Sequence, residues 1–121
     1  MNDHEEISSF HRLRKYIDYD SPEITDEDTV RIITIAGCEE IGRNMNVVET
    51  KDDIIVIDAG FMFVSEETGT PGVDYILPNT QYLEERKHKI RALVVTHGHL
   101  DHIGGIPYVM ERIGNPPIYT Q

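Results

Sequence analysis

The chain has 121 residues, of which 39% are hydrophobic and 27% charged, and its formal net charge is −11. This length allows one domain at most, or part of one. The longest apolar runs, residues 54–57 and 92–95, are far too short to span a bilayer, so we expect no membrane partner. The acidic balance argues against a chain that grips a phosphate backbone by itself, because such proteins usually carry a basic patch.

The N-terminus and the cysteine content predict a cytoplasmic location. Residues 1–6 are acidic and precede no apolar segment of the kind found in secretory signals. Cys38 is the single cysteine, which excludes an internal disulfide and fits a reducing compartment. Its neighbours Glu39 and Glu40 disfavour a reactive thiolate, so we expect Cys38 to be chemically inert.

Residues 1–28 differ in composition from the rest of the chain. They hold nine acidic and three basic residues, a net charge of −6. Phe10, Leu13 and Ile17 could line one side of a short helix, but the segment around Pro22 and the charge run that follows interrupt it. We expect residues 1–28 to form an acidic, flexible extension.

From Thr29 onward, strand patterns alternate with helix patterns. Thr80 is placed to cap a short helix, and Gly114 with the prolines after it should end a second one. The strands are predicted from β-branched and apolar runs separated by turn residues. The predicted strands cover residues 30–35, 45–50, 54–57, 91–96 and the segment from 118, and the predicted helices cover 81–86 and 102–113.

A strand meander followed by strand–helix–strand units indicates an α/β layered fold over residues 29–121. The strands 54–57 and 91–96 are apolar on both faces, and such strands need cover on both faces. The predicted helices are enough to cover one face. We therefore expect residues 29–121 to be a partial domain, the N-terminal piece of a larger protein.

Four side chains that bind metals well stand within six residues, directly after the strand predicted at 91–96. Alternate residues of an extended segment share a face, so His97 and His99 can aim at one point. Asp101 and His102 follow at a helix start and point to a neighbouring position. Two ligand pairs suit a dinuclear site. Zinc suits imidazole and carboxylate ligands, and manganese is also compatible with them.

Asp58 is the other residue with a predicted role in this site. It follows the apolar strand 54–57, and Gly60 allows a tight backbone there. We interpret Asp58 as a carboxylate that orients a ligand imidazole and fixes its tautomer. The alternative is a carboxylate that only stabilises the loop. The remaining histidines are isolated, and we expect them to face solvent: they are His4, His11 and His88.

These residues resemble a known superfamily. The run Thr96–His102 is similar to the signature of metallo-β-lactamase-fold hydrolases, and residues 57–60 resemble that superfamily's upstream aspartate motif. Within the superfamily the chain resembles ribonuclease J, of the β-CASP group, from about Val30 to Tyr119. The resemblance implies the N-terminal half of an αββα sandwich, incomplete, with the β-CASP and C-terminal parts absent. The segments that carry it are 40–45, 58–63, 72–78 and 97–108.

The resemblance also implies a function and a set of site residues. Ribonuclease J is a zinc-dependent 5′-3′ exonuclease and endonuclease in the processing and decay of RNA, including ribosomal RNA. Mapped onto this sequence, His97 and His99 bind one metal ion and Asp101 and His102 bind the second. Asp101 is also expected to be catalytic, and Asp58 supports the ligands from outside. The implied partner is RNA, held in part by the β-CASP domain, and the full-length protein is expected to be a homo-oligomer.

The sequence departs from the family pattern in three respects. Residues 36–39 stand where ribonuclease J has a glycine-rich stretch, and Asn79 stands where it has an aspartate. A third histidine, a metal-bridging aspartate and a further histidine come later in the family and are absent from these 121 residues. We therefore expect the isolated chain to be inactive and poorly folded.

Two other readings of the function stay open. One keeps the fold and changes the substrate to a thioester or another small ester, because the histidine cluster alone does not choose the substrate. The other is a non-catalytic remnant that acts as an interaction module.

Overall fold

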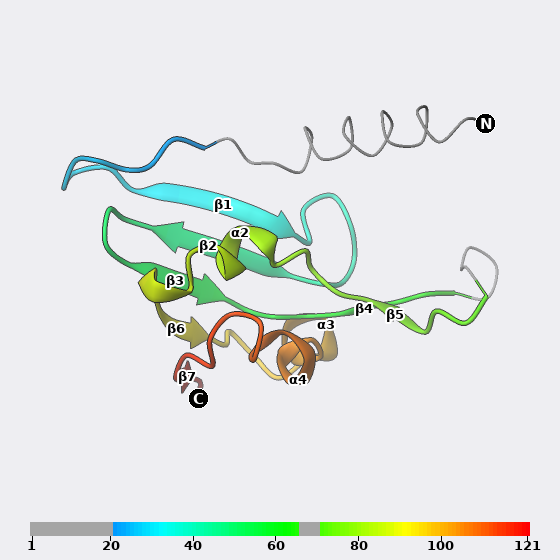
Figure 1. Ribbon diagram of the computed structural model, residues 1–121. Helices are drawn as coiled ribbons and strands as arrows, with labels where there is room; N and C mark the ends of the chain where they lie inside the picture. Colours follow the sequence, from blue (N-terminus) through cyan, green and yellow to red (C-terminus); the bar gives the residue numbers. More distant parts are fainter. Residues whose placement is uncertain (1–20, 66–70) are drawn as a thin grey trace, which may run out of the picture.

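The computed structural model describes residues 21–65 and 71–121, which form a five-stranded sheet, a two-stranded sheet and several short helices (Figure 1). Most of the expected extension, including the helix proposed around Leu13, lies outside the described residues. In its described part, Ile24 is buried. The strands are β1 (Arg31–Ala36), β2 (Met45–Glu49), β3 (Ile54–Ile57), β4 (Met62–Phe63), β5 (Tyr75–Ile76), β6 (Ile90–Val94) and β7 (Ile118–Tyr119).

The large sheet has the strand order β1-β2-β3-β6-β7, and β4 pairs with β5 in the small one (Figure 1). The pairs β1–β2 and β2–β3 are antiparallel, whereas β3–β6 and β6–β7 are parallel. The α/β fold predicted from the sequence is confirmed. Since β3 and β6 are parallel neighbours, their C-terminal ends lie at the same edge of the sheet.

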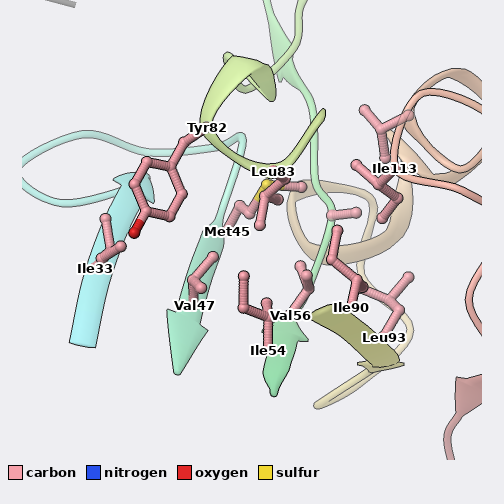
Figure 2. Close-up of a cluster of buried hydrophobic side chains, with 12 residues drawn as sticks. Ile33, Met45, Val47, Ile54, Val56, Tyr82, Leu83, Ile90, Leu93 and Ile113 are labelled. Carbon is pink, nitrogen blue, oxygen red and sulfur yellow. The ribbon is translucent and has the colours of Figure 1, made fainter. Parts of the chain in front are cut away.

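The hydrophobic core lies between one face of the sheet and the helices. Alternate residues of each strand point to this face, and Val47 on β2 pairs with Val56 on β3 in the middle of it. Burial of each such side chain stabilises the fold by about 1.5–3 kcal/mol. Figure 2 shows the cluster, in which the labelled residues are Ile33, Met45, Val47, Ile54, Val56, Tyr82, Leu83, Ile90, Leu93 and Ile113.

The opposite face of the sheet is open in the described part of the chain. Ile32 on β1 is 75% exposed and Tyr119 on β7 is 60% exposed, although both are large and apolar. Val48 and Ile55, which pair on this face in the middle of the sheet, are only half-buried. This agrees with the expectation that the chain covers one face of its sheet.

The helix predicted over residues 102–113 is wrong as one continuous element. Two short helices replace it, α3 (Leu100–Ile103) and α4 (Ile106–Val109), with Gly104 and Gly105 between them. A Cβ at Gly104 would lie 2.0 Å from the Phe61 ring, and one at Gly105 would lie 2.6 Å from a backbone carbonyl. The two glycines therefore let the chain pass close to the loop after β3, and this path bends the helix.

The predicted cap of the other helix is also wrong. Thr80 occupies the position before α2 (Gln81–Glu84), but its hydroxyl donates to Glu84 Oε2 at 2.9 Å. Asn79 Oδ1 accepts the Gln81 N–H at 3.0 Å instead. The chain then continues into the 3₁₀ helix η1 (Lys87–Lys89). No helix within residues 21–65 and 71–121 is long and apolar enough to cross a membrane.

Candidate metal centre

The predicted metal ligands gather at the edge where the parallel strands β3 and β6 end. Asp58 is the first residue after β3, and its N–H donates to Val94 O on β6 at 2.9 Å. The histidine segment begins three residues after Val94 and turns back into α3. The Ala59 N–H donates to His102 O at 2.8 Å, which joins the two loops. Crevices at the C-terminal edge of parallel strands are common ligand sites in α/β folds.

Asp58 is buried, at 3% exposure, and its backbone lies in the left-handed region with φ 64°. Its Oδ1 accepts the Thr96 N–H at 2.8 Å, and its Oδ2 accepts the Thr96 hydroxyl at 2.8 Å. The same Oδ2 lies 2.6 Å from His102 Nδ1. When Nδ1 carries the proton, the opposite nitrogen, Nε2, presents its lone pair away from Asp58, as a metal ligand must.

The three histidine rings of the cluster lie against one another. The centroid of the His97 ring is 4.1 Å from that of His102 and 4.6 Å from that of His99. Thr96 Oγ1 lies 3.0 Å from His97 Nδ1, so the same threonine contacts both Asp58 and a histidine. His97 and His99 are exposed, and solvent or a ligand can reach their ring nitrogens.

Asp101 completes the group on the other side of His102. Its Oδ2 lies 3.4 Å from His102 Nε2, and its backbone carbonyl accepts both the N–H and the side-chain amide of Asn44, at 3.0 and 2.9 Å. A Cβ at Gly60 would lie 1.7 Å from that carbonyl, so only glycine fits there. Sequence reasoning did not assign a role to Asn44, although its segment, residues 40–45, was among those that resemble ribonuclease J.

The donor set fits a divalent metal in its chemistry, because imidazole nitrogen and carboxylate oxygen are the usual ligands of zinc. The described residues do not, however, have the arrangement of a complete metal site. Within the described residues, no three or more histidine, cysteine, aspartate or glutamate side chains converge in an arrangement that would hold a metal ion.

The structure also describes two of the other residues that the sequence analysis considered. Cys38 is exposed on the loop between β1 and β2. His88 is exposed at the opposite edge of the sheet, beside a cavity that Arg31 and Glu49 also line. His4 and His11 lie outside the described residues.

Comparison with known proteins places the chain in a family. The sequence profile of the metallo-beta-lactamase superfamily matches residues 39–121, a span that contains Asp58 and the whole histidine cluster. The chain belongs to the metallo-β-lactamase superfamily, and this membership implies the use of a divalent metal ion.

Within that superfamily, the chain is similar to several ribonucleases J. The chain is 41% identical over 103 residues to ribonuclease J of Mycoplasma pneumoniae, which covers 85% of this chain and 18% of the relative. It is 48% identical over 87 residues to that of Thermus thermophilus (72% and 15%), and 46% over 89 residues to that of Corynebacterium glutamicum (74% and 12%). The predicted resemblance to ribonuclease J is confirmed. The chain spans less than a fifth of the length of these relatives.

Proposed function

We propose that this chain forms part of the active site of a metal-dependent ribonuclease that hydrolyses RNA phosphodiester bonds. The observation that carries the proposal is the contact of the buried Asp58 carboxylate with His102 Nδ1 at 2.6 Å. A carboxylate held on one nitrogen of an imidazole is the usual support of a metal-binding histidine. The similarity to ribonucleases J, rather than the cluster itself, directs the choice of RNA as the substrate.

In this proposal His97 and His99 hold one metal ion, and Asp101 and His102 hold the second, with zinc as the metal. Bound metal ions would activate water near neutral pH and neutralise negative charge on the phosphate. The chain's own residues keep the ligands in place. Asp58 orients His102, and Thr96 in turn fixes Asp58 through two hydrogen bonds. Asn44 fixes the backbone of Asp101.

RNA binding needs more than this chain offers by itself. The formal charge of −11 gives no general attraction for a polyanion. We therefore propose that other parts of the enzyme share the binding of RNA, as the length of the relatives supports. A cytoplasmic homo-oligomer that processes and degrades RNA, including ribosomal RNA, remains our proposal for the whole protein, on the ground of the same resemblance.

Residues 1–121 alone are proposed to be inactive. Two ligand candidates for each metal ion, without a bridging group, should bind zinc weakly. Zinc-dependent cleavage of RNA by the isolated 121-residue chain would contradict this proposal.

The test of the proposed function compares His99→Ala with wild type in the natural gene product that carries this sequence. We expect His99→Ala to lower the rate of cleavage of a labelled single-stranded RNA by roughly 10³-fold or more, because an exposed ligand candidate is lost while the core is untouched. Wild-type cleavage should also stop in a chelator and return with Zn²⁺ or Mn²⁺. Zinc content measured by elemental analysis gives a second readout that does not depend on turnover.

His88→Ala is the matched control, since His88 is exposed but lies far from the cluster at the other edge of the sheet. It should keep wild-type activity and metal content. Unchanged turnover in His99→Ala would remove the metal assignment. Efficient turnover of a thioester together with no cleavage of RNA would favour the other hydrolase reading.

A further inference from the structure

A groove with aromatic and aliphatic walls adjoins the metal centre. Its volume is about 340 Å³, within the range of small-ligand sites. Five of its seven lining residues are apolar, and the polar one is Asp101, a proposed metal ligand. We call it the aromatic groove; its lining residues are Ile41, Gly42, Phe61, Met62, Phe63, Leu100 and Asp101.

The large side chains of the aromatic groove are exposed rather than packed into the core. Ile41 is 90% exposed, Phe63 69% and Leu100 51%. Three separate segments contribute them: the loop before β2, strand β4 and the first residue of α3. Contiguous apolar exposure of this kind usually marks a binding surface.

The aromatic rings at the groove have a firm support. Phe61 packs edge-to-face on Phe63, with 4.8 Å between ring centroids, and lies 5.4 Å from the Tyr75 ring. The Phe61 backbone bonds to the loop before β2 and to α3, through its carbonyl to Arg43 N at 2.9 Å and through its N–H to Leu100 O at 3.3 Å. The Phe63 ring is therefore exposed but packed against the fixed Phe61, so another aromatic group can stack on it.

The charges around the groove indicate which part of an RNA chain it would accept. Among the described residues no lysine or arginine lines it, and the nearby Arg43 is engaged by Glu40, with Nε and Oε1 2.7 Å apart. Apart from the metal ions proposed at Asp101, a phosphate in the groove would find no cation to offset its charge. An uncharged, flat, aromatic group meets no such penalty, and every nucleobase has a face that can stack on an aromatic side chain.

We propose that the aromatic groove receives one unpaired nucleobase of the RNA substrate, adjacent to the phosphate at the metal centre, by stacking on Phe63. The inference rests on the proposed function, because the position of the base follows from a phosphate held beside Asp101. Phe63 is in this view a substrate-positioning residue that acts on binding and takes no part in the chemistry.

The test separates KM from kcat in the natural gene product. Phe63→Ala should raise KM for a single-stranded RNA about tenfold, the low to middle part of the range for loss of one base–aromatic stack, and leave kcat unchanged. Phe63→Tyr should restore KM because it keeps the ring, whereas Phe63→Leu should not. Zinc content, measured by elemental analysis, should be equal in all of these proteins because Phe63 is not a proposed metal ligand.

A second measurement locates the base. RNAs with a single abasic position near the cleaved bond should show the same rise in KM with wild type, and no further rise with Phe63→Ala. Val30→Ala is the control, since Val30 is also exposed, at 58%, but does not line the groove. Its KM should equal that of wild type.

The outcomes distinguish the two proposals. If wild type cleaves RNA and Phe63→Ala has an unchanged KM, the stacking site is wrong and the proposed function stands. If the Phe63→Ala variant instead changes its oligomeric state with KM intact, the groove is a protein contact and the nucleobase is excluded. If wild type cleaves no RNA under any metal condition, both proposals fall together.

Discussion

The two edges of the large sheet each hold a buried carboxylate, and the two carboxylates have different surroundings. Glu49 ends β2 at one edge and is 1% exposed; Asp58 follows β3 at the other edge and is 3% exposed. Burial of a charged group is unfavourable unless it is paired or hydrogen-bonded. The partners of each carboxylate therefore indicate what it does.

Glu49 is surrounded by cations. Its Oε1 lies 3.0 Å from Lys89 Nζ and 3.8 Å from Arg86 Nε, and its Oε2 lies 3.5 Å from an Arg31 nitrogen and accepts a hydrogen bond from Tyr82. Burial raises the pKa of Glu49, but the hydrogen bonds from Tyr82 and Lys89 and the charges of Lys89 and Arg31 outweigh it, so the pKa lies below its ordinary value. Both carboxylate oxygens are fully engaged inside the protein.

Within residues 21–65 and 71–121, no lysine or arginine side chain pairs with Asp58. Its partners are the Thr96 amide and hydroxyl and one nitrogen of His102. Its positive φ is a conformation that side chains other than glycine rarely adopt, and such backbone strain clusters at functional sites. The partners of Glu49 are cations and a tyrosine, so its contacts are structural. Asp58 instead contacts Nδ1 of His102, whose Nε2 is directed away from Asp58.

Removing the charge of Glu49 should have the largest effect on stability. Glu49→Gln leaves Arg31, Arg86 and Lys89 without their shared partner, and we expect the free energy of unfolding to fall by about 2–3 kcal/mol. This is below the usual loss for a fully buried pair because the three cations are themselves partly exposed. Urea denaturation of the natural gene product measures it.

The same variant should keep its activity, because Glu49 lies at the edge opposite the metal centre. Under conditions in which Glu49→Gln is folded, kcat and KM for RNA should match those of wild type. A loss of turnover in the folded variant would show that the two edges are coupled, which would contradict a purely structural role for Glu49.

Removing the charge of Asp58 should produce the reverse pattern. Metal binding and turnover should fall, and the free energy of unfolding should change less than in Glu49→Gln. Asp58→Asn keeps the shape of the side chain but offers His102 Nδ1 an amide in place of a carboxylate. We expect metal affinity and turnover to fall about 10- to 100-fold, as for other residues that support a metal-binding histidine. Isothermal titration with Zn²⁺ and RNA cleavage assays measure the two effects. Asp52→Asn, at an exposed turn, should change neither.

Of the two buried carboxylates, the sequence analysis singled out only Asp58. Asp58 stands at the end of an apolar strand and beside glycine, and that local pattern is enough to single it out. Glu49 was passed over, although strict alternation along β2 places it on the same face as Met45 and Val47. Its cations come from β1, from the segment after α2 and from η1, which are 18 to 40 residues away, so only the assembled sheet brings them together.

The secondary structure shows the same division between local and distant causes. The strands at 54–57 and 45–49 were predictable because apolar periodicity is local. The break of the last predicted helix at Gly104 and Gly105 was not, since it depends on the Phe61 ring and on backbone from the loop after β3. The pairing of β4 with β5 was likewise missed, because two-residue strands carry no periodic signal.

The smallest expected effect is the acid dependence of the Glu49 network. Because the pKa of Glu49 is lower in the folded than in the unfolded chain, its stabilising contribution is complete above the ordinary value of 4.5 and disappears as the pH falls through the folded value. The difference in unfolding free energy between wild type and Glu49→Gln should therefore be constant from pH 7 to about pH 5.5 and shrink below about pH 4.5.

Other carboxylates titrate in the same range, but they do not affect this difference. The pKa values of Asp26 and Glu40 are also lowered, by hydrogen bonds from Thr29 and Arg43, and both groups are present in both proteins. Urea denaturation of the two proteins at matched pH values isolates the contribution of Glu49. A difference that grew on acidification would mean that burial outweighs the cations and that the folded pKa lies above 4.5, which would reverse the structural role assigned to Arg31 and Lys89.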